Sequence, residues 1–172
     1  FQLSKYFSEK SLFNYRSSIE ILYFELLLET LFIDNTFKDE LENLKTELLI
    51  LDDNDYNQIK SIEDITNHDV KALEYFIKKK MEKYPKLLKY SEYVHFGLTS
   101  EDINSPSYTM MIKDSINNVI NPIISQIINK LKQICNDFQG GNLVGYTHGQ
   151  AASPTTLSKE LYVFLYRLEK IF

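Results

Sequence analysis

Apolar residues recur at helical spacing along most of this sequence, and that pattern restricts the possible folds more than any other feature. Side chains three and four positions apart share one face of a helix, so each such run predicts a helix with one buried face. Only 5 Gly and 4 Pro occur among 172 residues, so few positions break a helix. No run alternates apolar and polar residues over more than a few positions. The sequence therefore predicts an all-α fold.

Two helices are predicted near the N-terminus. Ser8 can cap the first, which spans about 9–34, and the second spans about 38–51. Helical spacing predicts that one face of each is buried. The residues of these faces are Leu12, Tyr15, Ile19, Leu22 and Leu26 in the first helix, and Leu41, Leu44, Leu48 and Leu51 in the second.

A polar loop is predicted at 52–57, followed by a shorter helix over about 56–63. Thr66 and Asp69 have the spacing of a capping box, with Asp in place of the usual Glu. They precede a predicted helix over 70–83. The buried face predicted for this helix contains Val70, Leu73, Phe76, Ile77 and Met81.

The second half of the chain is predicted to contain two long helices. Ser100 can cap the first, which continues to about Phe138, and Pro122 should kink or interrupt it. A turn rich in glycine and small residues follows at 145–152. Ser153-Pro154 then has the pattern of an N-cap followed by proline at the first helical position, which predicts the start of the last helix.

The three histidines, His68, His95 and His148, each lie at or just before a predicted helix start. Free N–H groups and a partial positive charge make helix N-termini suitable for anions, so three such starts are compatible with a site for a polyanionic ligand. The alternative is that helix starts are polar in any protein and that histidines are tolerated on surfaces. Local chemistry leaves both interpretations open.

Charge and cysteine content exclude several classes of protein. The net charge of −5 argues against a nucleic-acid-binding surface. Glu25 and Glu29 interrupt the most apolar run, so no segment is predicted to span a membrane. Cys135 is the only cysteine and is predicted to be a buried, inert thiol in a reducing, cytoplasmic compartment. The spacing of His and Cys predicts no metal site.

Three stretches in the same order resemble conserved regions of the adenylosuccinate lyases, a family of the aspartase/fumarase superfamily. His95-Phe-Gly-Leu-Thr-Ser-Glu-Asp-Ile-Asn104 resembles one region, Thr147-His-Gly-Gln150 with the residues to Glu160 a second, and Thr66-Asn-His-Asp-Val-Lys-Ala72 a third. The sequence departs from the family pattern at Ala151, where proline is usual, and at Ser158, where glycine is common.

The resemblance implies β-elimination of a C–N bond without a cofactor. Adenylosuccinate would give AMP and fumarate, and the related succinylaminoimidazole carboxamide ribotide would give its amide and fumarate, both in purine biosynthesis. By the same resemblance, His148 would be the general acid. The residues that it implies for substrate binding are Asn67, His68, Asp69, Thr99, Ser100 and Thr147.

The family's serine-bearing loop, Gly-Ser-Ser-x-Met-Pro-x-Lys-x-Asn, does not occur in the sequence. We therefore expect a fragment that is inactive alone, with an N-terminal helical domain at 1–97 and the beginning of a central helical bundle at 98–172. The resemblance implies a homotetramer in which the conserved regions meet from different subunits. Apolar faces cut from such a bundle, such as Leu161, Leu165 and Leu168, are expected to be exposed and to favour self-association.

Two alternatives to this function remain open. One is a sister lyase of the superfamily, such as argininosuccinate lyase, although the sister families usually have a different sequence at the Thr99-Ser-Glu-Asp102 motif. The other is a helical association module that keeps the fold without catalysis.

Overall fold

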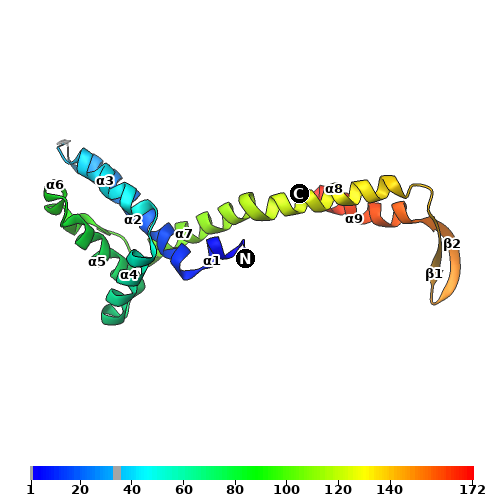
Figure 1. Cartoon of the computed structure of the whole chain (residues 1–172), viewed down its shortest axis with the longest axis horizontal. Coiled ribbons are helices and arrows are strands. Elements are labelled where there is room, and N and C mark those ends of the chain that lie inside the picture. Colours follow the sequence, from blue (N-terminus) through cyan, green and yellow to red (C-terminus); the bar gives the residue numbers. More distant parts are fainter. Residues whose placement is uncertain (1, 33–35) are drawn as a thin grey trace. The chain divides into compact units, whose positions relative to one another are not determined.

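The computed structural model describes residues 2–32 and 36–172, and the chain divides into two compact units at Ser115/Ile116 (Figure 1). The first unit contains α1 (Ser4–Phe7), α2 (Glu9–Leu31), α3 (Lys38–Leu49), α4 (Asp53–Thr66), α5 (Asp69–Met81), α6 (Pro85–Leu88), the 3₁₀ turn η1 (Ser91–Tyr93) and α7 (Ser100–Ser115). The second contains the π-helical turn η2 (Ile116–Ile120), α8 (Asn121–Asp137), β1 (Asn142–Thr147), β2 (Gln150–Thr156) and α9 (Leu157–Ile171). The fold is mostly helical, as predicted, with one hairpin that the all-α prediction did not include.

The starts of α2 and α4 show how capping side chains set helix boundaries. Ser8 caps α2 as predicted, because its hydroxyl accepts a hydrogen bond from Ser11 N at 3.2 Å. The predicted polar loop at 52–57 is wrong. Asp52 accepts from Asp55 N at 2.7 Å while Asp55 Oδ2 accepts from Asp52 N at 3.4 Å, so a reciprocal capping box begins α4 at Asp53.

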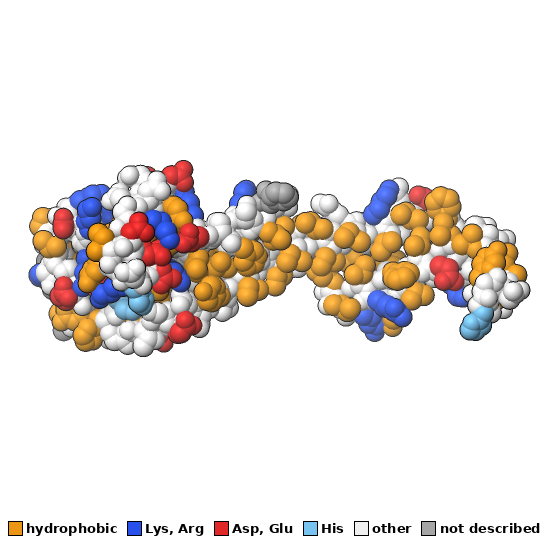
Figure 2. All heavy atoms as spheres, turned by 90° about the horizontal axis from the view of Figure 1, so that it is seen from below, with side chains coloured by type: hydrophobic (Ala, Val, Ile, Leu, Met, Phe, Trp, Pro, Cys, Tyr) orange, Lys and Arg blue, Asp and Glu red, His pale blue; other side chains and the backbone are white. Residues whose placement is uncertain are grey.

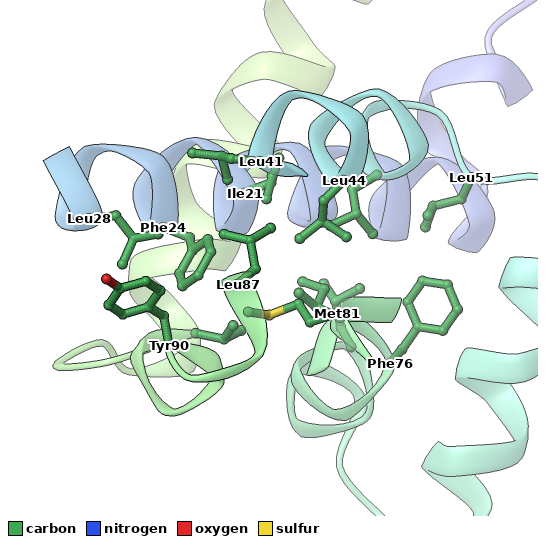
Figure 3. Packing of buried hydrophobic residues seen from close by; sticks show 14 of the residues in the cluster. Ile21, Phe24, Leu28, Leu41, Leu44, Leu51, Phe76, Met81, Leu87 and Tyr90 are labelled. Carbon is green, nitrogen blue, oxygen red and sulfur yellow. The ribbon is translucent and has the colours of Figure 1, made fainter. Parts of the chain in front are cut away.

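The core of the first unit lies between α2, α3, α5 and α6 (Figure 3). The faces predicted for α3 and α5 are buried, with side chains such as Leu44, Phe76 and Met81 at 0% exposure. Leu87 of α6 and Phe24 of α2 pack into the same cluster. Each fully buried side chain of this size contributes roughly 1.5–3 kcal/mol to folding, so this cluster stabilises the helices that carry the candidate site.

The buried face predicted for α2 is wrong. Leu22 and Leu26 are 43% and 62% exposed, whereas the buried face contains Ile21, Arg16 and Glu20. Helix α2 carries apolar side chains on more than one face, so spacing alone does not select one. Its buried charges are tolerated because each has a partner of opposite charge in another element.

The second unit packs α8 against α9. Ile128, Cys135 and Leu165 are buried together, with Leu161 and Leu168 packed partly buried against them. The predicted exposure of the face at Leu161, Leu165 and Leu168 is therefore wrong, whereas burial of Cys135 is confirmed at 5% exposure. The exposed apolar side chains of α9 belong to other faces, and hydrophobic side chains gather on the visible surface over α8 and α9 (Figure 2). The exposed apolar side chains of α9 are Tyr162, Val163, Phe164, Tyr166 and Ile171.

The predicted interruption near Pro122 is confirmed. The π-helical turn η2 directly precedes α8, and Pro122 is the second residue of α8. A proline at this point also cannot continue the hydrogen-bond ladder of a preceding helix, which accounts for the change in helical pitch just before it.

The hairpin β1–β2 replaces the predicted early start of the last helix (Figure 1). Ser153 and Pro154 lie in β2, so the prediction that they cap and begin the helix is wrong. The antiparallel pairs run from Asn142↔Thr156 to Thr147↔Gln150, so these residues form strands although the local sequence favours a helix start. The actual cap of α9 is Thr156, whose hydroxyl accepts from Lys159 N at 3.1 Å.

Candidate functional site

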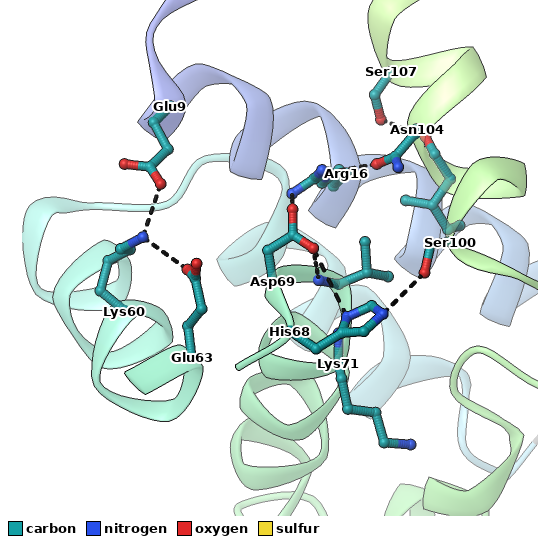
Figure 4. A network of polar contacts seen from close by, with 12 residues as sticks. Glu9, Arg16, Lys60, Glu63, His68, Asp69, Lys71, Ser100, Asn104 and Ser107 are labelled. Carbon is teal, nitrogen blue, oxygen red and sulfur yellow. Dashed lines mark hydrogen bonds and ion pairs between the residues drawn. The ribbon is translucent and has the colours of Figure 1, made fainter. Parts of the chain in front are cut away.

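The first group of predicted site residues gathers where the N-terminal ends of α5 and α7 meet (Figure 4). Asn67 and His68 form the turn between α4 and α5, and Asp69 begins α5. Thr99 directly precedes α7, and Ser100 begins it. His68 Nε2 lies 3.4 Å from Ser100 Oγ, although the two residues are 32 positions apart in the chain. The structure thus brings two of the three resembling stretches into contact.

His68 caps α5, and this role defines its hydrogen-bonding state. Its Nδ1 accepts a hydrogen bond from Lys71 N at 3.1 Å. Because Nδ1 then carries a lone pair, the proton of the neutral ring is on Nε2, the atom that faces Ser100. The predicted capping box at Thr66 and Asp69 is wrong, since Thr66 ends α4 and its hydroxyl donates to His68 O at 3.1 Å instead.

Asp69 has both carboxylate oxygens engaged. Oδ1 accepts from Val70 N at 2.8 Å, and Oδ2 lies 2.7 Å from Arg16 Nη1. Burial alone would raise the pKa of Asp69, but the Val70 N–H and the Arg16 charge outweigh it and lower that pKa below its usual value. Asp69 is therefore a fixed anion beside the His68 ring.

The start of α7 is organised by Thr99 and Asp102. Asp102 Oδ2 accepts from Thr99 N at 2.7 Å and from Thr99 Oγ1 at 2.8 Å. The hydrogen bond from the Thr99 backbone is the main reason that the pKa of Asp102 is lowered. Ser100 is the first residue inside the helix, so the prediction that it is the cap is wrong. Its hydroxyl is directed toward His68 instead.

Two residues of α2, neither of which was predicted from the sequence, hold the turn that precedes α7. Glu20 Oε1 lies 2.5 Å from His95 Nδ1, and Tyr23 OH donates to Phe96 O at 2.8 Å. His95 has a positive φ of 61°, which non-glycine residues adopt rarely. The hydrogen bond to Glu20 outweighs burial and raises the pKa of His95.

A third functional residue that sequence reasoning missed is Arg16, which contacts Asp69. A signal was present: Arg16 and Glu20 are two charges one helical turn apart in the middle of a predicted helix. That spacing places both on one face, where a buried charge requires a partner.

The second group of predicted site residues, Thr147 and His148, lies in the hairpin of the second unit. Thr147 ends β1, and His148 and Gly149 form the two-residue turn with φ values of 49° and 78°. Positive φ at both central residues matches a type I′ turn, the preferred connection for twisted antiparallel strands. His148 is exposed at this turn. The predicted site residues therefore fall into two groups, one in each compact unit.

Other features of the described residues do not coincide with these groups. A surface pocket of about 470 Å³ lies between α4 and α5, lined by residues such as Asn54, Gln58 and Lys80, at the end of α5 opposite His68. Within residues 2–32 and 36–172, no cluster of His, Cys, Asp and Glu could hold a metal ion. Across the same ranges, no helix combines the length and apolarity that crossing a membrane requires.

Comparison with known proteins gives a consistent result. A family model described as lyase matches residues 2–170. The chain is 40% identical over 171 residues to the adenylosuccinate lyase of Buchnera aphidicola subsp. Acyrthosiphon pisum (strain APS), covering 98% of this chain and 38% of that protein. The adenylosuccinate lyase of Dictyostelium discoideum is 42% identical over 176 residues, covering 97% and 37%. That of Escherichia coli (strain K12) is 36% identical over 167 residues, covering 95% and 37%.

Solved structures support the fold. The fumarate lyase from Mesorhizobium sp. BNC1 superposes with a TM-score of 0.79 at 16% identity, covering 98% of this chain and 37% of that one. The β-carboxy-cis,cis-muconate cycloisomerase from Acinetobacter calcoaceticus sp. ADP1 gives a TM-score of 0.75 at 18% identity, covering 98% and 38%. The chain thus spans less than two fifths of the length of the curated relatives that it matches.

Proposed function

Because the chain belongs to the lyase family, we propose that the complete protein cleaves adenylosuccinate to AMP and fumarate by β-elimination. The related succinylaminoimidazole carboxamide ribotide would be its second substrate, giving the corresponding amide and fumarate. The names of the relatives, at 36–42% identity across nearly the whole chain, support this choice within the family. No cofactor is required for this elimination, since a base and an acid suffice.

The observation that carries the proposal is the contact between His68 and Ser100, 3.4 Å apart where two helices begin. Helix N-termini present unpaired N–H groups and a partial positive charge, which favour carboxylates and phosphates. The hydroxyl of Ser100 and the Nε2–H of His68 add donors at the same place, and Thr99 lies beside them. This arrangement suits the succinyl carboxylates of the proposed substrates.

In the proposed reaction, a base removes the proton from the carbon next to a carboxylate, the C–N bond breaks, and an acid protonates the leaving nitrogen. We assign the acid to His148, because an exposed imidazole at a hairpin turn can reach a substrate bound by other elements. Thr147 would position the substrate beside it, and Asn67 and Asp69 would contact the substrate from the start of α5. The base would come from a serine loop that this chain does not contain.

We further propose that residues 1–97 belong to an N-terminal domain and residues 98–172 to a central helical bundle. The complete protein would be a cytoplasmic homotetramer whose conserved regions meet from different subunits. Exposed apolar residues such as Tyr108 and Ile112 on α7 and Ile123 and Ile127 on α8 support an assembly role for the long helices. Because other subunits and the serine loop would complete the site, this chain would be inactive by itself.

The test is an assay of the complete protein with adenylosuccinate and, in parallel, with argininosuccinate, measuring fumarate release. Turnover of adenylosuccinate supports the proposal. Turnover of argininosuccinate alone would assign a sister activity of the family, and turnover of neither would favour a helical association module.

A further inference from the structure

Arg16 is a buried charge that joins three helices of the first unit. Its side chain is 4% exposed. From α2, its Nη1 lies 2.7 Å from Asp69 Oδ2 on α5, and its Nε donates to Asn104 Oδ1 on α7 at 2.9 Å (Figure 4). The guanidinium also lies over the Phe13 ring, 5.5 Å from its centroid. A planar guanidinium can hold two acceptors in fixed directions, which a lysine ammonium cannot.

Both contacts of Arg16 lie beside residues of the candidate site. Asp69 directly follows His68, and Asn104 lies one helical turn beyond Ser100. The amide of Asn104 is oriented further because its Nδ2 donates to Glu101 Oε1 at 2.9 Å. Arg16 therefore ties the first turn of α5 to α7 at a point one turn after Ser100, and the approach of these two helices sets the distance between His68 and Ser100.

Asp69 is also positioned to change the tautomer of His68. Its Oδ1 lies 3.8 Å from His68 Nδ1, the atom that accepts the hydrogen bond from Lys71 N. A carboxylate released toward the ring would attract a proton to Nδ1, and the ring could then no longer cap α5 through that atom. Arg16 holds Oδ2 of Asp69 and the Val70 N–H holds Oδ1, so neither oxygen accepts a hydrogen bond from His68 Nδ1.

We infer that Arg16 is a positioning residue: by holding Asp69 and Asn104, it keeps the His68 proton on Nε2 and directs it toward Ser100 and the bound substrate. This inference rests on the proposed function for its effect on turnover, but its effect on the His68 tautomer does not. Arg16 itself is buried and acts through His68 and Ser100.

The test uses Arg16→Lys in the complete protein. Lysine keeps the charge and the aliphatic stem but cannot bridge Asp69 and Asn104. We expect kcat/KM for adenylosuccinate to fall by about 10²-fold, the size of effect that a small misplacement of binding groups produces. The matched control is Lys80→Met, which removes the 2.7 Å pair between Lys80 and the buried Asp55 at the far end of α5. The control should lower the unfolding temperature without changing kcat/KM.

The second measurement is ¹⁵N NMR of the His68 imidazole. In the wild type, Nδ1 should have the shift of an unprotonated nitrogen and Nε2 that of an N–H. In Arg16→Lys, protonation should move at least partly to Nδ1, and adding Asp69→Asn to this variant should restore the wild-type tautomer. If Arg16→Lys does not fold, Arg16→Gln is measured in the same way.

The outcomes are distinguishable from those of the functional proposal. A wild-type tautomer in Arg16→Lys, with kcat/KM no lower than in Lys80→Met, would overturn the inference. A complete wild-type protein that does not cleave adenylosuccinate would refute the proposed function, while the NMR comparison would still decide the role of Arg16.

Discussion

Replacing Glu20 by glutamine is expected to remove a pH-dependent contribution to the stability of the first unit. Glu20 is fully buried, with 0% side-chain exposure, and its Oε1 lies 2.5 Å from His95 Nδ1. The hydrogen bond to this carboxylate raises the pKa of His95 and outweighs the opposing effect of burial. Glu74 adds to the increase in that pKa, and Lys71 acts against it.

The direction of the pH dependence follows from this shift. The folded pKa of His95 lies above the ordinary value of 6.5, so the folded protein binds the proton more tightly than the unfolded chain does. The stabilisation is complete below about pH 6.5 and is lost as the pH rises through the raised folded pKa. A charge-assisted hydrogen bond contributes roughly 1.5–3 kcal/mol and a neutral one about 0.5–1.5, so Glu20→Gln should cost about 1 kcal/mol at pH 6.

The assay is urea unfolding of the wild type and of Glu20→Gln between pH 6 and pH 9, with unfolding monitored by circular dichroism. The difference in unfolding free energy should be largest at pH 6 and should shrink as the pH rises. The matched control is Glu25→Gln on the same helix, whose carboxylate pairs with Lys45 Nζ at 2.8 and 2.9 Å. The pKa of Lys45 is raised from an already high value, so this control should lose the same free energy at every pH.

Parallel stability curves for the wild type and Glu20→Gln would refute the reasoning. They would mean either that His95 does not change protonation on folding or that Glu20 stabilises it equally in both protonation states. A decrease for Glu25→Gln with the same pH dependence would point to a general effect of charge on α2 and not to the His95 pair.

Four further substitutions test the site and the helix starts in the complete protein. His148→Gln should leave the circular dichroism spectrum unchanged and lower kcat by roughly 10²–10⁴-fold, and near-wild-type turnover would exclude His148 as the acid. Ser100→Ala should raise KM without lowering the unfolding temperature, because Asp102 and not Ser100 makes the hydrogen bonds to Thr99 at the start of α7; unchanged kinetics would remove Ser100 from the site. Thr156→Ala should destabilise α9 by about 1 kcal/mol in urea unfolding, whereas Ser153→Ala should not, and the reverse order would restore the cap predicted from sequence.

Helical spacing predicted α3 and α5 well because each has a single apolar face. Leu41, Leu44 and Leu48 of α3 all lie in the core, as do Leu73 and Phe76 of α5. In such helices, turning the helix to another face would bury charged residues without partners, so only one orientation is favourable. Sequence alone is sufficient in this case.

The same reasoning failed for α2 because the burial of Arg16 and Glu20 depends on partners far away in the chain. Asp69 and His95 make those charges acceptable in the interior, at 2.7 and 2.5 Å. A pattern that counts only apolar positions assigns both residues to the solvent. The helix whose buried charges hold the candidate site, α2, was thus the one whose buried face periodicity could not assign.

The hairpin was missed for a related reason. Ser153-Pro154 is a good local signal for a helix start, but the signal for pairing is distributed over two strands. A β-carbon at Gly145 would lie 2.7 Å from Ser153 O, so this close approach of the strands requires glycine. Neither strand alternates apolar and polar residues, because both faces of the hairpin are largely exposed. Period-two reasoning therefore had no pattern to detect.

Backbone conformation connects the three resembling stretches in a way that the sequence does not show. Among the described residues, the non-glycine positions with positive φ are Asn67, His95 and His148, and each lies within or at the edge of one of these stretches. Such conformations cost stability in non-glycine residues, although Asn and His tolerate them better than most. Glycine would remove that cost at each position. That amide and imidazole side chains occupy all three therefore supports a role for these side chains themselves, independently of the motif resemblance.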